Sequence, residues 1–285
     1  GSRQTTVEYG GLSSSNGNII WSGNARPVPG IWLETSHYLP VPFTRNKLQF
    51  TARFGNGILT DDRWVEDAQL HHKSLFFKWA INPTNELIFG AEDYAVWGGT
   101  SRSLGPLPKD FNDFLRVVGG LSGDGNSPEG DEINSLGNHV GAYRLEWRKK
   151  WEHLNLNLYW SHPFEDRSGR ELNNIEDGLW GIFLDFKKPE SFVHQVLFEF
   201  TYTKDQSGKG QIDGFDDFFN NTIYRSGFTF FGRTLGSPFF TPAEKDENGI
   251  TPGVQNNSSI AWHTGAKGKL AQNLYYKTLH SLSFN

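Results

Sequence analysis

The stretch YRLEWRKKWEHLNLNLYW, from Tyr143 to Trp160, decides the fold. Apolar and polar residues alternate along both of its halves. The apolar set is Tyr143, Leu145, Trp147 and Trp151, followed by Leu154, Leu156, Leu158 and Trp160; the polar set is Arg144, Glu146, Arg148 and Lys150, followed by Asn155 and Asn157. A period of two is typical of a β-strand with different surroundings on its two faces. The stretch therefore predicts two consecutive strands.

The same alternation recurs along almost the whole chain. Further runs lie at 30–38, 47–54, 73–80, 86–97, 180–186, 192–202, 260–270 and 274–284. Together the runs predict roughly eleven or twelve strands. Many of them are about 8–12 residues long, whereas strands of soluble sheets average ~5–6 residues.

The two faces of these strands differ in an unusual way, because the face opposite the apolar one is charged or carries amides. Aromatic residues gather near strand ends, at Trp147, Trp151, Trp160, Trp180 and Tyr202. A transmembrane β-barrel requires an apolar outside, a polar inside and aromatic girdles at two heights. We therefore predict an all-β fold over residues 1–285, a transmembrane antiparallel β-barrel with about 12 strands in this chain, long loops and one short helix. A soluble β-sandwich or lectin-like barrel also alternates and is the alternative.

The composition excludes several other classes. The chain has 285 residues, a net charge of −5 and no cysteine, so disulfides, thiolate metal sites and a general nucleic-acid footprint are not expected. No apolar run approaches the ~20 residues of a spanning helix, whereas β spans need only about 9–11. The chain begins at Gly1 without the pattern of a signal peptide, and we expect a processed or truncated product.

One long segment, 101–139, does not alternate and is predicted to be an inserted outer loop or a plug. Inside it, Asp110 can cap a short helix at 110–118, and Gly119–Gly120 can end that helix. Residues 204–217 and 241–259 are predicted to be two further polar loops.

The aromatic stretch 217–240 is predicted to form a further strand of the barrel wall. A strand is expected to begin at Asn220–Tyr224 and to alternate from Gly227 to Arg233. Phe228 and Phe230 are then expected to face lipid, and Thr229 and Arg233 the lumen. Phe231, on the polar side, is an exception that suggests either inward packing or a ligand contact.

Five stretches carry a resemblance to a known family: SGNARPVPGIWLETSHYLPVPF (22–43), VWGGTS (96–101), YWSHPFEDRSG (159–169), DGLWGI (177–182) and FFNNTIYRSGFTFFGRTLGSPFF (218–240). In this order they resemble the Wzi capsule-assembly proteins, most closely the versions in Bacteroidota. The resemblance implies an outer-membrane β-barrel of up to about eighteen strands, of which this chain is the middle and C-terminal part. It also implies a lectin-like, non-catalytic role in holding capsular polysaccharide at the cell surface, with outer-membrane lipid and other outer-membrane proteins as further partners.

The segment HPFEDRSG offers a polar cluster at the mouth of a hairpin. Its candidate polysaccharide-binding residues are His162, Glu165, Asp166 and Arg167; Trp97, Arg225, Phe231 and Arg233, from the family-like stretches, complete the set. The alternative is an ordinary turn shaped by Pro163. Glu165 and Asp166 are adjacent and diverge along a strand, so no pair of opposed catalytic carboxylates is predicted.

We expect no catalytic residue, cofactor or resident metal. His71 and His72 are adjacent and point to opposite faces of a strand, which makes them poor co-ligands. The stretch DGNSPEGDE (124–132) departs from a calcium-binding loop, and only a loose surface Ca²⁺ site is conceivable there or at Asp213, Asp216 and Asp217.

The charges on the polar face allow two interpretations, a salt-bridged interior or a lining that meets an anionic polymer. They are Arg53, Lys78, Arg144, Glu146, Arg148, Glu199, Arg233, Lys267 and Lys269. The alternatives to polysaccharide attachment are a porin-like channel for oligosaccharides or ions, a structural subunit of a larger outer-membrane complex and, last, an outer-membrane enzyme.

Overall fold

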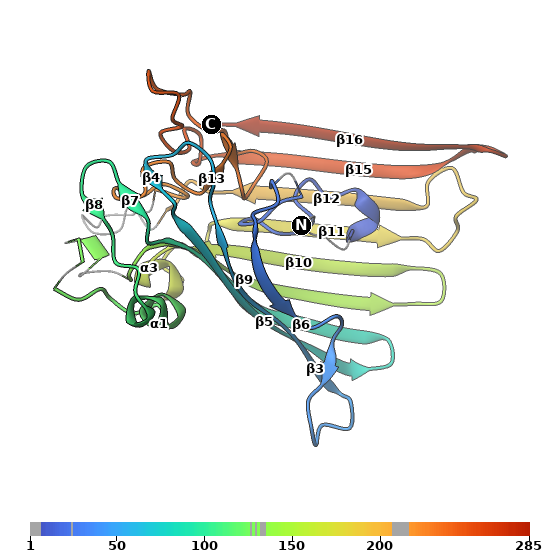
Figure 1. The fold of residues 1–285 in the computed structure, drawn as a ribbon. Coiled ribbons are helices and arrows are strands. Elements are labelled where there is room, and N and C mark those ends of the chain that lie inside the picture. Colours follow the sequence, from blue (N-terminus) through green and yellow to red (C-terminus); the bar gives the residue numbers. More distant parts are fainter. Residues whose placement is uncertain (1–6, 24, 126, 129, 132–134, 207–216) are drawn as a thin grey trace.

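Eleven β-strands form one curved antiparallel sheet, which is the body of the molecule (Figure 1). The computed structural model describes residues 7–23, 25–125, 127–128, 130–131, 135–206 and 217–285. The strands follow the order β1-β3-β5-β6-β9-β10-β11-β12-β15-β16, with β2 paired to β3. Their bounds are β1 (Gly30–Glu34), β2 (Leu39–Pro40), β3 (Leu48–Ile58), β5 (Gln69–Asn82), β6 (Asn85–Trp97), β9 (Asn138–Lys150), β10 (Asn155–Phe164), β11 (Gly178–Asp185), β12 (Gln195–Tyr202), β15 (Ile260–Ala271) and β16 (Leu274–Phe284). The predicted antiparallel all-β fold is confirmed; within the described part of the chain the sheet is open, with β1 and β16 as its edges.

The two ends of the sheet differ in the length of their connections. Turns of two to nine residues join β5 to β6, β9 to β10, β11 to β12 and β15 to β16 at one end. The other end carries the longer connections 59–68, 98–137, 165–177 and 203–259. The small sheet joins β4 (Val65–Glu66), from the first of them, to β7 (Thr100–Ser101) and β8 (Gly105–Pro106), from the second, and the hairpin of β13 (Thr229–Phe230) and β14 (Arg233–Thr234) lies in the last. Short turns at one rim and long loops at the other are typical of outer-membrane barrels.

The outer face of the sheet is apolar in the rows nearest the short turns. Antiparallel register places one large side chain from each of the eight strands from β3 to β15 in this sheet at the same height, in the row Phe50, Phe77, Phe89, Leu145, Trp160, Trp180, Phe200 and Trp262. These side chains are half-buried or exposed: Leu145 is 44% exposed and Trp262 45%. On the opposite face, Glu146 is fully buried. The predicted alternation is therefore present with the predicted polarity.

A segment near the N-terminus, residues 7–22, covers the polar inner face (Figure 1). The ring of Tyr9, from the short 3-10 helix η1 (Tyr9–Gly11), stacks on Tyr159 with centroids 4.2 Å apart. Glu199 accepts hydrogen bonds from Ser13 Oγ (2.5 Å), Ser14 Oγ (2.9 Å) and Ser14 N (3.1 Å), and the His263 ring contacts the Leu12 carbonyl at 2.7 Å. Gly181 makes room for this packing, since a Cβ there would lie 1.9 Å from the Tyr159 ring.

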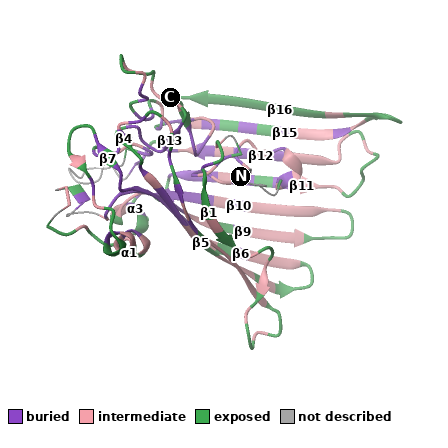
Figure 2. Cartoon of the chain, viewed as in Figure 1, coloured by how far each residue is buried: buried purple, intermediate pink, exposed green. Residues whose placement is uncertain are grey.

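The charges of the inner face are largely paired with one another. Glu146 accepts from Arg144 at 2.8 Å and from Arg148 at 2.7 Å, and Lys267 donates to the Gly10 carbonyl at 3.0 Å. Figure 2 shows that burial is concentrated toward the loop end and where this segment lies on the sheet. These contacts favour the salt-bridged interior over a lining that meets an anionic polymer.

The helix in the 98–137 connection lies on the outer face of the sheet. α1 (Phe111–Gly119) begins after Asp110, whose side chain accepts from the Asp113 amide, and ends at Gly120 in the left-handed conformation. Val117 packs with Ala95, Trp97 and Leu136, which lie on the face opposite that of Tyr94 and the N-terminal segment. The choice between an outer loop and a plug for the whole insertion stays a prediction. No helix of the described residues is long and apolar enough to cross a membrane.

The prediction for 217–240 is wrong. This stretch forms only the two-residue strands β13 and β14 and otherwise folds as a loop at the loop end of the sheet. Phe228 and Phe230 do not face lipid; they are 0% and 2% exposed and belong to the interior cluster. Thr229 is also buried, and Arg63 donates to its carbonyl at 3.1 Å. Rings on alternate residues bury equally well in a protein interior, and the alternation alone cannot distinguish that interior from lipid.

Candidate functional site

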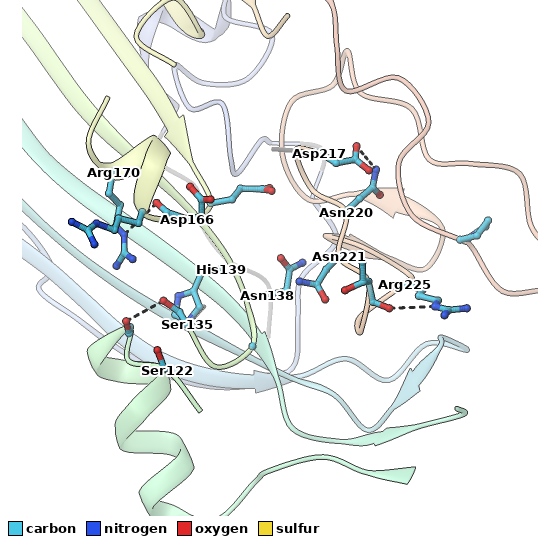
Figure 3. Close-up of a pocket in the computed structure, with 16 residues that line it drawn as sticks. Ser122, Ser135, Asn138, His139, Asp166, Arg170, Asp217, Asn220, Asn221 and Arg225 are labelled. Atoms are coloured by element: carbon cyan, nitrogen blue, oxygen red, sulfur yellow. Dashed lines mark hydrogen bonds between the residues drawn. The ribbon is translucent and has the colours of Figure 1, made fainter. Parts of the chain in front are cut away.

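An open cavity of about 860 Å³ lies at the loop end, where three connections meet (Figure 3). One wall comes from the start of the 165–177 connection, with Asp166 and Arg170, and the opposite wall from 217–225, with Asp217, Asn220 and Arg225. The floor comes from Ser122 and Ser135 and from the first residues of β9, Asn138 and His139. Among the described residues the lining contains no Phe, Tyr or Trp, so this part of the surface binds through hydrogen bonds and charge.

The wall that contains Asp166 is fixed by a short helical turn, α3 (Arg167–Arg170). Asp166 precedes it and accepts from Ser168 Oγ at 2.7 Å and from Gly169 N at 3.2 Å. Glu165 reaches across to the other wall and accepts from the Phe219 amide at 2.5 Å. Glu165 therefore holds the two walls together, and Asp166 fixes the turn on its own wall.

The opposite wall is built by two consecutive asparagines. Asn220 exchanges two hydrogen bonds with the Val254 backbone, donating to its carbonyl at 2.8 Å and accepting from its amide at 2.7 Å. Asn221 accepts from the amides of Ile223 and Tyr224, as side chains do at turns. Asp217 accepts from Asn220 and from Asn257. These amides fix an irregular loop that lacks the regular pairing of a strand.

Three arginines on the walls are each held through Nε. Arg167 donates to Glu171 at 2.7 Å, Arg170 to the Asp166 carbonyl at 3.2 Å and Arg225 to the Thr222 carbonyl at 3.2 Å. None of their terminal nitrogens donates a hydrogen bond within the described part of the chain. A guanidinium anchored in this way presents two parallel donors that match a carboxylate.

The floor contributes one buried amide. Asn138 is 3% exposed, and its Nδ2 has no hydrogen-bond partner among the described residues. His139 next to it is fully engaged, with Nδ1 2.9 Å from Asp93 Oδ2 and Nε2 3.1 Å from the Leu136 carbonyl. Asn138 therefore supplies a donor that a ligand can satisfy, and His139 supplies shape.

The structure brings together four of the eight candidate residues, since Glu165, Asp166, Arg167 and Arg225 all line this cavity. The other four lie elsewhere. Trp97 is buried under α1 and donates from Nε1 to Asn56 at 3.1 Å. Phe231 is 48% exposed with Arg26 5.3 Å from its ring centroid, and Arg233 is exposed on β14.

His162, the remaining candidate, is fully buried on β10. Its Nδ1 lies 2.8 Å from the carbonyl oxygen of Asp177. Burial raises the pKa of the Asp177 carboxyl to about 6. The hydrogen bonds that this carboxyl accepts from the amides of Asp205 and Gln206 act in the opposite direction but do not outweigh burial. His162 therefore fixes the 165–177 connection from beneath and does not reach the cavity.

Sequence reasoning missed the asparagines, Arg170, Asp217 and the floor residues. The asparagines stand inside the quoted FFNNTIYRSG stretch, and that motif was the available signal. The floor residues come from a non-alternating loop whose path the sequence did not indicate. His71 and His72 lie on opposite faces, against Phe114 and Tyr94, and no group of three or more His, Cys, Asp or Glu gathers among the residues described. Asn126, Glu129, Asp213 and Asp216 of the considered Ca²⁺ sites lie outside the described residues.

A long-stranded antiparallel sheet with an apolar outer face, a paired polar inner face and one rim of long loops defines a membrane β-barrel protein. The family model described as "Capsule assembly protein Wzi" matches residues 13–267, and the chain belongs to this family. Its location is accordingly the bacterial outer membrane.

A solved structure has the same fold. It is that of Wzi from Escherichia coli, described as an outer-membrane protein involved in group 1 capsule assembly and as a carbohydrate-binding β-barrel. The TM-score is 0.51 at 14% identity, and the match covers 94% of this chain and 60% of that chain. The chain therefore spans less than two thirds of its structural relative. No curated protein matches it significantly.

Proposed function

We propose that this chain forms part of a non-enzymatic outer-membrane barrel that binds capsular polysaccharide in the loop-end cavity. The observation that carries the proposal is the donor set of the cavity, in which Arg167, Arg170, Arg225 and the buried Asn138 line an open space of about 860 Å³. Family membership and the carbohydrate binding of the E. coli relative support the same ligand class. Acidic sugars fit best, because their carboxylates pair with the free ends of the arginines.

The carboxylates of the cavity favour binding over hydrolysis. Glu165 and Asp166 both accept backbone amides, and Asp217 accepts two side-chain amides. A general acid or base needs a carboxyl that can reach the proton it transfers. Here each carboxyl is committed to loop structure.

A porin-like channel is less well supported. Residues 7–22 lie on the inner face and are held there by Glu199, Tyr159 and His263. A segment fixed in this way occupies lumen space that a permeating solute would need.

The first test is binding of purified capsular polysaccharide to the purified protein. Arg167→Ala and Arg225→Ala each remove one guanidinium, and Arg102→Ala, whose Arg pairs with Glu66 outside the cavity, is the matched control. A hydrogen bond to a charged group contributes about 1.5–3 kcal/mol, so affinity should fall roughly ten- to hundredfold for the cavity variants. Equal affinities for all variants would refute the site.

The second test is capsule retention in a strain that lacks the gene, complemented with the same variants. The proposal expects capsule to be shed without the protein and retained with wild type or Arg102→Ala. Cell-bound capsule at wild-type level in the deletion strain would overturn the attachment role.

A further inference from the structure

A second cavity, of about 540 Å³, lies on the outer face of the wall immediately beside the first. Gly120, Ser135, His139, Glu165 and Arg170 line both cavities. The hollow therefore continues from the polar loop end onto the surface that faces the membrane.

This second cavity lies over a row of the wall in which two of the side chains are alanines. Directly above the aromatic row that includes Phe77 and Phe89, the register places Ala52, Leu75, Ala91 and Tyr143 in the next row. One row further, Gly141 lies beside Phe164, whose ring covers it so closely that a Cβ would lie 2.1 Å from the ring. The recess therefore lies over Ala52 and Ala91, whereas the Phe164 ring fills the space at Gly141.

The chemistry of the wall changes from apolar to charged at this height. Phe54 is 40% exposed and Leu75 is 45% exposed, and both line the recess. In the row above, Lys73 donates to Asp93 at 2.6 Å, and Asp93 contacts His139. On an outer-membrane wall, the step from an apolar band to charged residues marks the depth at which lipid tails meet their headgroups.

We propose that the joined cavities hold one molecule of a glycolipid from the surrounding outer leaflet. Its acyl chains lie against Phe54 and Leu75 in the recess, and its saccharide leaves the bilayer past Arg170 into the polar cavity. A lipid without a sugar fills only the lower half, and a sugar without acyl chains fills only the upper half. The saccharide half of this proposal rests on the function proposed above, and the acyl half does not.

The test fills the recess with an apolar side chain, so that the wall remains compatible with lipid. Ala91→Trp on β6 and Ala52→Phe on β3, which lies on the other side of β5, occupy the recess. Ala266→Trp, on the outer face of β15 outside the cavity, is the matched control. Native mass spectrometry of the purified full chain then measures retention of three probes: rough-type lipopolysaccharide, its deacylated oligosaccharide and phosphatidylglycerol.

Wild type and Ala266→Trp should retain the lipopolysaccharide, and the two filling variants should retain about tenfold less. Phosphatidylglycerol should be retained less well than lipopolysaccharide by every variant. Undiminished lipopolysaccharide retention by both folded filling variants, or equal retention of phosphatidylglycerol by wild type, would overturn the glycolipid site. If the proposed polysaccharide function is wrong, wild type will not bind capsular polysaccharide but will still retain lipopolysaccharide, so the two failures can be distinguished.

Discussion

Removing the Glu199 carboxylate should release the N-terminal segment from the inner face of the wall. Glu199 is 1% exposed and accepts four hydrogen bonds, from Tyr159 (2.6 Å) and, in the segment, from Ser13 and twice from Ser14. Glu199→Ala removes the acceptor of the buried Tyr159 hydroxyl and of the half-buried Ser13 and Ser14 donors. A hydrogen bond to a charged group contributes about 1.5–3 kcal/mol, so the loss of several of them should cost about 3 kcal/mol or more.

Much of this cost should appear as local opening, because three of the four donors belong to residues 7–22. If about 3 kcal/mol is lost locally, hydrogen exchange of the amides of this segment should accelerate by roughly two orders of magnitude. The assay is hydrogen–deuterium exchange of the protein in detergent, followed peptide by peptide. Amides of β9 and β10 serve as the internal reference.

Two variants make the reasoning falsifiable. Glu199→Gln keeps one acceptor oxygen and should accelerate exchange less than Glu199→Ala. Glu190→Ala removes an exposed partner of Lys269 and should change exchange little, since surface ion pairs contribute about 0–1 kcal/mol. Protection of residues 7–22 at wild-type level in Glu199→Ala would show that the carboxylate does not hold the segment.

Three further predictions follow from single contacts. Gly181→Leu should abolish the folded, heat-modifiable form on electrophoresis, because its Cβ would overlap the Tyr159 ring, whereas Gly125→Leu, with open space around it, should fold normally. Arg63→Ala should lower the free energy of unfolding by about 3–5 kcal/mol, because it removes the ion-pair partner of Asp61 and the hydrogen bonds to the loop that contains β13. Hydrogen exchange should become faster in that loop alone, and unchanged exchange there would contradict the prediction. Burial raises the pKa of the Asp177 carboxyl from 3.8 to about 6, so the folded state binds more protons between these values and the local stability should fall as pH rises through that window. Carboxyl NMR should show a titration near pH 6 that Asp177→Asn removes, and a midpoint near 4 would contradict the burial argument.

The strands were predictable because alternation is local. Glu146 and Leu145 differ in polarity and are adjacent in sequence, and a strand sends neighbours to opposite faces whatever its partners are. The helix after Asp110 was predictable for the same reason, since its cap and its ending glycine lie within one short segment. The loops were not, and Phe228 shows why: its burial depends on contacts with Tyr94 and Phe219, which no local pattern specifies.

The site divides in the same way. Glu165, Asp166 and Arg167 were predicted from one polar hairpin mouth, and the structure places them on a cavity wall together with Arg225. Asn138 and Asn221 came from segments far apart in the chain, and only the fold shows that they line the same space. His162 lies on the buried side of the same hairpin, because the 165–177 connection folds back over it.

By itself, then, the sequence determined a long-stranded antiparallel wall with an apolar and a polar face, since those features follow from neighbouring residues and the geometry of a single strand. The tertiary structure decided which surfaces meet lipid, protein or ligand. It placed residues 7–22 on the inner face, folded the aromatic loop into the interior and brought three connections together around one cavity. Such contacts join residues separated by tens to hundreds of positions, so they are set by strand register and loop packing rather than by any local pattern.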